Sequence, residues 1–162
     1  MNIFYLDEDA KKCAQYHYNI HISKMILESA QMLSTATWCL SPLLAEDLYK
    51  QELCYLPTHI NHPCNIWVRE SNSNFLWLKN LAIYLNEEKK HRFRSGNHKS
   101  IYVVLSLPVP SNIKTEFTTP ALAISDKSLH FNDPVLSYRK YYMTDKRHMA
   151  KWTDRDIPHW WT

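Results

Sequence analysis

Glycine is almost absent from this chain of 162 residues, which contains only Gly96. Globular proteins average roughly 7% glycine, and all-β folds place many glycines in tight turns. The scarcity therefore argues against an all-β architecture and favours helices joined by loops of Pro, Asn, Ser and Thr. We expect a mainly α, compact single-domain helical bundle over residues 1–162, with three main helices and a long extended connection.

Other patterns are also missing. The four cysteines form no CxxC pair and no zinc-ribbon spacing, and no apolar run approaches the roughly 18 residues that a membrane span needs. The start "MNIFYLDEDAKK" is acidic within ten residues, unlike a signal peptide. These features predict free thiols in an intracellular, cytoplasmic protein; the cysteines are Cys13, Cys39, Cys54 and Cys64.

Two of the three long helices lie in the first hundred residues. Apolar periodicity predicts the first over roughly residues 9–38. The second is expected to begin at "NHPC", where Asn61 can cap it and Pro63 fits the first turn. It should end near Gly96, because helix C-termini often need a left-handed residue.

The remaining segments are shorter or extended. Residues 2–6 predict a short strand or an extended arm, and residues 41–62 a loop with one short helix. The β-branched stretch at 100–120, interrupted by prolines, is expected to be extended, with room for a short strand. The third long helix should begin after "FNDP", with Asp133 as its cap and Pro134 at its first position, and run through "VLSYRKYYMTDKRHMAKW".

A narrow polar stripe runs along the first predicted helix, through "HISKMILESAQML" (21–33). At about 100° per residue, six polar side chains fall within a wedge of about 80°. Apolar residues occupy most of the remaining circle, so this helix should be largely buried. The six residues are His17, His21, Lys24, Glu28, Gln31 and Thr35.

Three interpretations of the stripe stay open. It can be the narrow exposed edge of a core helix. It can be the wall of a site, with Glu28 as acid/base residue flanked by Lys24, His17 and His21 as further catalytic candidates. The spacing of His17, His21 and Glu28 also suits a metal, but there is no HExxH-type signature, so we assign no metal and no cofactor.

The charge distribution points to an anionic partner. Residues 1–60 carry four basic and seven acidic groups, a net −3, whereas residues 61–162 carry fifteen and nine, a net +6. A basic half suits nucleic acid, a nucleotide or phosphate, although it also suits a merely solvated surface.

Basic and aromatic residues interleave in "KKHRFRSGNHK" (89–99) and "YRKYYMTDKRHMAKW" (138–152). Basic groups can neutralise phosphates and aromatic rings can stack on bases. Part of this set falls at helical spacing, Tyr142 included, and can belong to the core. The candidates for contact with nucleic acid or phosphate are His62, Arg92, His98, Lys99, Arg139, Tyr141, Tyr142, Lys146 and Trp152.

Three segments taken in order resemble the pyrimidine-dimer DNA glycosylase family. They are the early Lys-x-x-x-Glu helix, the block "HPCNIWVRESNSNFLWLKNLAIYLNEEKKHRF", and "YRKYY" followed by an aromatic tail. The chain also resembles small phage-encoded proteins that share these blocks. The resemblance implies an all-α fold that binds duplex DNA around a flipped nucleotide. In that family the nucleophile is the α-amine of an N-terminal threonine, paired with a glutamate on the first long helix.

The sequence departs from this family at its start. Residue 2 is Asn2 and not a threonine, and we expect Met1 to be retained before it. Glu28 also lies about one helical turn later than the family's glutamate. Lys24 offers a substitute nucleophile. The leading hypothesis is a DNA glycosylase-like, DNA-processing enzyme. The alternatives are a hydrolase or transferase acting on a small nucleotide or phosphorylated metabolite, and a non-catalytic DNA-binding protein.

Overall fold

The computed structural model describes residues 1–162, and its regular secondary structure is helical. The only β-type pairing is an isolated bridge between Ser71 and Lys114, so the prediction of a mainly α fold is confirmed. Two 3-10 turns, Lys127–Leu129 and Arg147–Met149, accompany the helices. The α-helices are α1 (Ala10–Tyr16), α2 (Asn19–Leu40), α3 (Pro42–Lys50), α4 (Pro63–Glu70), α5 (Asn72–Phe93), α6 (Ile101–Ser106) and α7 (Pro134–Met143).

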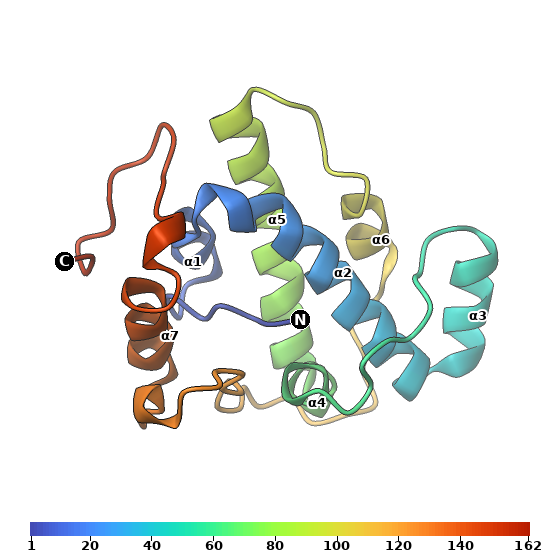
Figure 1. Cartoon of the computed structure of the whole chain (residues 1–162). Helices are drawn as coiled ribbons and strands as arrows, with labels where there is room; N and C mark the ends of the chain where they lie inside the picture. The colour runs from blue at the N-terminus through green and yellow to red at the C-terminus, as the bar shows by residue number, and fades with distance from the viewer.

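Helices α2 and α5, of 22 residues each, form the centre of the molecule. They cross in Figure 1, with α4 and α6 beside them and α3 at the edge of the fold. Most of α2 is buried, as its wide apolar arc predicted: Ile22, Met25 and Ile26 are at most 2% exposed. None of the helices combines the length and apolarity that a membrane crossing requires.

The single helix predicted over 9–38 is wrong, because the chain breaks between α1 and α2. His17 and Tyr18 have extended backbone angles. The Arg92 guanidinium donates to the carbonyl oxygens of His17 and Gln15 at 2.8 and 2.7 Å. Those carbonyls at the end of α1 are therefore satisfied without a continuing helix, and this partner lies about 75 residues away in the sequence.

The second predicted helix is also divided. Ser71 separates α4 from α5, and its hydroxyl accepts from the backbone N–H of Asn74 at 3.1 Å, so it caps α5. The cap of α4 is His62 rather than Asn61. Helix α5 ends at Phe93, and the left-handed residue that closes it is Arg94 with φ 48°, not Gly96.

The extended connection predicted after residue 100 contains a helix, α6. Ile101, Val103 and Val104 are buried on it, and it packs against both α2 and α5. Tertiary burial thus overrides the strand preference of these β-branched residues. The predicted start of the third helix is confirmed, since Asp133 accepts from the backbone N–H of Val135 at 2.8 Å. That helix, α7, ends at Met143, earlier than predicted.

The first residues form an extended arm that enters the core. Residues 3–6 are all at most 5% exposed and form no strand. The Asn2 side chain fixes the start of the arm: it donates to the carbonyl of Ala123 at 2.9 Å and accepts from the Tyr138 hydroxyl at 3.0 Å. The arm therefore brings the amino end of the chain onto the middle of α2.

Candidate functional site

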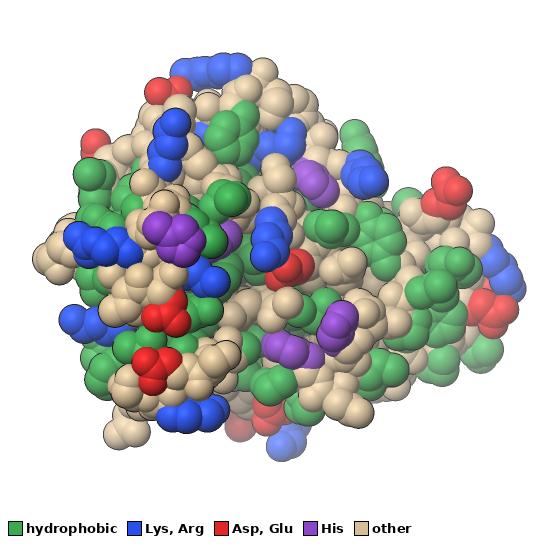
Figure 2. Space-filling view, viewed as in Figure 1, with side chains coloured by type: hydrophobic (Ala, Val, Ile, Leu, Met, Phe, Trp, Pro, Cys, Tyr) green, Lys and Arg blue, Asp and Glu red, His purple; other side chains and the backbone are tan.

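The Glu28 carboxylate is the centre of the candidate site. Its side chain is only 13% exposed, and its Oε2 accepts from the backbone N–H of Asn2 at 3.0 Å. Two amino groups flank it: the amine of Met1 lies 3.9 Å from Oε2, and Lys24 Nζ lies 3.8 Å from Oε1. Figure 2 shows an acidic and a basic side chain side by side near the place where Figure 1 marks the N-terminus.

A turn with two histidines lies beside this carboxylate. We call residues 58–62 the histidine turn, since it contains His59 and His62. Burial lowers the pKa of His62, the positive amine of Met1 lowers it further, and the negative Glu28 raises it. Both groups are thus within electrostatic range of the imidazole, which joins the candidate site.

Buried polar side chains hold the histidine turn in place. Thr35, on the predicted stripe, accepts from the backbone N–H of Thr58 at 3.1 Å. Asn65 donates to the carbonyls of Thr58 and His59 at 3.1 and 2.8 Å and contacts Met1 Sδ at 3.2 Å. Because Thr35 and Asn65 are fully buried, the turn and the first residue are fastened to α2 and α4.

The two histidines of the predicted stripe, His17 and His21, belong to the core. His17 is fully buried, with Nδ1 2.7 Å from the carbonyl of Cys13 and no partner for Nε2. His21 is 4% exposed and stacks on Phe4, with Nδ1 2.7 Å from the Tyr142 hydroxyl. Burial lowers the pKa of His17 to about 4 and that of His21 to about 3. Their geometry gives them no route to a ligand, and we remove them from the catalytic set.

Two arginines predicted to bind phosphate have structural partners instead. Arg92 is 3% exposed, and its Nε lies 2.9 Å from Glu88 Oε2. Arg139 donates to the carbonyl of Leu6 at 2.8 Å and pairs with Asp7 at 3.0 Å. Both guanidinium groups therefore hold elements of the fold together, and neither belongs in the phosphate-binding set.

The C-terminal aromatics divide between core and surface. Tyr142 is fully buried and stacks on Tyr18 with centroids 4.2 Å apart. Trp152 donates to the carbonyl of Tyr16 at 2.9 Å and packs edge-on against Tyr18. Tyr141 is half-buried and carries Lys146 Nζ 5.3 Å above its ring. Tyr141 and Lys146 stay candidates for contact with a nucleic acid, whereas Tyr142 is buried and the indole N–H of Trp152 is already used inside the fold.

The loop after α5 leaves one basic side chain free. Lys99 is exposed, and no ion pair holds it. His98 is half-buried, and its Nδ1 accepts from the backbone N–H of Ser100 at 3.2 Å. Burial lowers the pKa of His98, and the nearby charges of Lys89 and Lys99 lower it further. Lys99 therefore remains a candidate for binding phosphate through its charge, and His98 remains one as a neutral hydrogen-bond donor.

Sequence reasoning did not find the contacts that complete the site. Met1, Asn2 and Asn65 all lie around Glu28 or the histidine turn, although no motif marks them. The one usable signal was the apolar run "IFYL" directly after Asn2, which suits a buried arm. No three His, Cys, Asp or Glu side chains meet in a group that could hold a metal ion.

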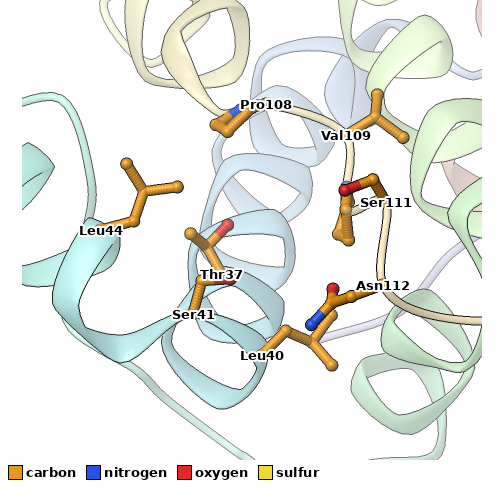
Figure 3. A pocket seen from close by; sticks show the side chains of 9 residues that line it. Thr37, Leu40, Ser41, Leu44, Pro108, Val109, Ser111 and Asn112 are labelled. Atoms are coloured by element: carbon orange, nitrogen blue, oxygen red, sulfur yellow. The ribbon is translucent and has the colours of Figure 1, made fainter.

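A separate cavity of about 240 Å³ lies near the C-terminal end of α2. Figure 3 shows side chains from α2 and the start of α3 facing the segment after α6 across it. Its lining contains hydroxyl, amide and apolar groups but no ionisable side chain, so it offers no acid, base or charge for catalysis. The lining residues are Thr37, Leu40, Ser41, Leu44, Pro108, Val109, Pro110, Ser111 and Asn112.

No family model, no curated protein sequence and no solved structure matches this chain.

Proposed function

We propose that this protein is a nucleic-acid-directed enzyme with a DNA glycosylase-like, base-excising activity. One observation carries the proposal: a partly buried carboxylate, Glu28, has the amine of Met1 and the amine of Lys24 within 4 Å. Imine-forming base excision requires an amine beside a carboxylate. Asn2 stands where the family has its threonine nucleophile, but the α-amine of Met1 lies at the carboxylate in its place.

The reaction would proceed by nucleophilic displacement. An unprotonated amine attacks C1′ of a flipped nucleotide, so that a nitrogen–C1′ bond forms while the bond from C1′ to the base breaks. The base leaves with the electron pair and takes up a proton. While it is ionised, Glu28 stabilises the positive charge that develops on the sugar, and it then accepts the proton that the attacking amine gives up. It returns this proton to O4′ as the bond from C1′ to O4′ breaks, which opens the sugar ring and leaves the imine that borohydride reduces.

Of the two amines, the one on Met1 is the better placed nucleophile. The side chain of Met1 is 4% exposed, whereas that of Lys24 is 61% exposed, so Met1 is the more firmly fixed. α-Amines also lose their proton more readily than lysine amines do at neutral pH. We therefore assign attack to Met1 and charge stabilisation near the DNA backbone to Lys24.

The experiment is reductive trapping on duplex DNA that contains a single lesion or abasic site. Borohydride added during the reaction should join protein and DNA covalently, and peptide mapping should place the adduct on Met1. Glu28→Gln keeps an oxygen that can accept from the Asn2 N–H, so it should fold normally while trapping falls by about 10²–10⁴-fold. Glu87→Gln, on the exposed face of α5, is the matched control.

Other outcomes have clear meanings. An adduct on Lys24 would identify Lys24 rather than Met1 as the nucleophile, with Glu28 still its partner. Tight DNA binding without any trapping would favour a non-catalytic DNA-binding protein. A fully active Glu28→Gln variant would overturn the assignment of the site.

A further inference from the structure

His62 has a fixed role in the hydrogen bonding of its own backbone. Its Nδ1 lies 3.2 Å from the backbone nitrogen of Cys64, at the start of α4. A backbone N–H can only donate, so Nδ1 must be the unprotonated acceptor of this bond. The single proton of the neutral ring is therefore on Nε2, the atom at the far side of the imidazole.

The surroundings of His62 keep the ring in that neutral form. Protonation would place hydrogens on both nitrogens and break the bond to Cys64. Burial lowers the pKa of His62, and the neighbouring amine of Met1 lowers it further, against the opposing effect of Glu28. Near neutral pH the half-buried side chain thus presents one N–H donor and no charge.

The histidine turn is built more rigidly than a surface loop needs to be. The fully buried side chains of Thr35 and Asn65 both bind its backbone. Asn65 also has a buried Oδ1 with no hydrogen-bond partner, which is an unusual cost in a folded protein. These bonds hold the backbone of the turn, and the bond to the Cys64 N–H holds the His62 ring itself; such preorganisation suits a binding group.

We propose that His62 contacts the ligand directly, as a neutral donor from Nε2–H to a phosphate oxygen of the nucleotide held at Glu28. The proposal rests on the proposed function for the nature of the ligand. It also gives the site a second contact that is independent of the reacting amine. A neutral donor suits this position, because Nδ1 must stay unprotonated to accept from the backbone N–H of Cys64, which leaves Nε2–H as the group that can donate to a ligand.

Two substitutions distinguish the role of His62 as a hydrogen-bond donor to the ligand from its role as the N-cap of α4. His62→Asn retains a good N-cap for α4 but has no donor at the distance of Nε2. His62→Gln reaches further and can present an amide N–H, but it is a poor N-cap. We expect His62→Asn to melt within about 2 °C of the wild type and to bind duplex DNA containing a tetrahydrofuran abasic analogue about 10- to 100-fold more weakly.

We expect the opposite pattern for His62→Gln, with lower stability and binding closer to that of the wild type. The proposal would be overturned if His62→Asn bound this DNA as the wild type does. It would equally be overturned if binding followed stability, so that His62→Gln were the weaker binder.

An NMR measurement tests His62 without any enzymatic activity. Nitrogen correlation spectra of the imidazoles should show His62 protonated at Nε2 and not at Nδ1 at neutral pH. Titration with inorganic phosphate should shift the His62 ring signals, and His148, exposed on the 3-10 turn Arg147–Met149, serves as the reference ring. If the His62 signals shift with phosphate but borohydride trapping never yields a covalent adduct, the glycosylase proposal is wrong and the proposed His62–phosphate contact stands. Protonation at Nδ1, or no selective shift, would overturn this one.

Discussion

His21 Nδ1 lies 2.7 Å from the hydroxyl oxygen of Tyr142 inside the protein. This contact joins the start of α2 to α7 through two residues that lie 121 positions apart in the sequence. Tyr142 in turn accepts, at its backbone carbonyl, a hydrogen bond of 2.7 Å from the hydroxyl of Tyr18. A histidine that looks catalytic in the sequence is thus part of the internal packing between the two ends of the chain.

Acid should destabilise the protein through its two core histidines. Burial lowers the pKa of His17 to about 4 and that of His21 to about 3, whereas in the unfolded chain both should lie near 6.5. Below that pH the unfolded state binds protons that the folded state does not. The free energy of unfolding should therefore fall by up to about 1.4 kcal/mol per pH unit for each histidine between roughly pH 6 and pH 4.

Urea unfolding at a series of pH values measures this slope. A His21→Gln variant should show a shallower fall with acid, while the exposed His148→Gln variant should keep the wild-type slope. A stability that stays constant from pH 6.5 to pH 4.5 would contradict the burial of neutral histidines.

Removing one buried carboxylate should cost much more than removing an exposed one next to it. Glu88 is 4% exposed and pairs with Arg92 at 2.9 Å and Arg155 at 2.7 Å. Glu88→Gln leaves the Arg92 charge buried without a counter-ion, so we expect a loss of about 3 kcal/mol in the free energy of unfolding. Glu87→Gln, which removes only an exposed pair with Lys90, should change it by less than about 0.5 kcal/mol. Equal losses in chemical denaturation would refute this account.

Two threonines on α2 provide a test of the histidine turn. Thr35 binds the backbone of Thr58, whereas Thr37 donates only to the carbonyl of Leu33 in its own helix, at 2.9 Å. Thr35→Val should therefore speed hydrogen exchange in residues 58–62 and weaken DNA binding. Thr37→Val should do neither, although both residues are buried. Equal exchange in the two variants would mean that Thr35 does not hold the turn.

Binding to duplex DNA should weaken steeply as salt is added. Each phosphate neutralised contributes about −0.9 to the slope of log K against log salt concentration. Lys99→Gln should make that slope shallower by about 0.9. Lys50→Gln should leave it unchanged, because Lys50 pairs with Glu46 on α3 at the edge of the fold. A flat salt response with tight nucleotide binding would instead favour a small-molecule substrate.

Local signals in the sequence predicted some features well. The wide apolar arc of α2 predicted its burial because burial follows helical periodicity. Pro63 and Pro134 marked the first turns of α4 and α7 because proline is favoured at that position. Glu28 stays at the centre of the candidate site, since its place on a narrow polar stripe is a local property of α2.

The features that the sequence could not predict depend on distant partners. The break at His17 needs the guanidinium of Arg92, and the burial of Arg92 needs its ion pair with Glu88, a carboxylate that Arg155 also binds. Helix α6 forms from β-branched residues because α2 and α5 bury them. No local pattern shows that the amine of Met1 meets Glu28, because a buried arm carries it there.

The attachment of Asn2 sets the order in which the candidate site can form during synthesis. Asn2 bonds to Ala123 and Tyr138, which the ribosome adds more than 120 residues later. Until those partners emerge, the Asn2 side chain lacks its two long-range partners, and only the contacts with Glu28 and Asn65 hold the first residues. A nascent chain that already contains Glu28, Lys24 and the histidine turn would thus still lack the anchor of the Asn2 side chain, and the candidate site is completed only after Tyr138 has been added.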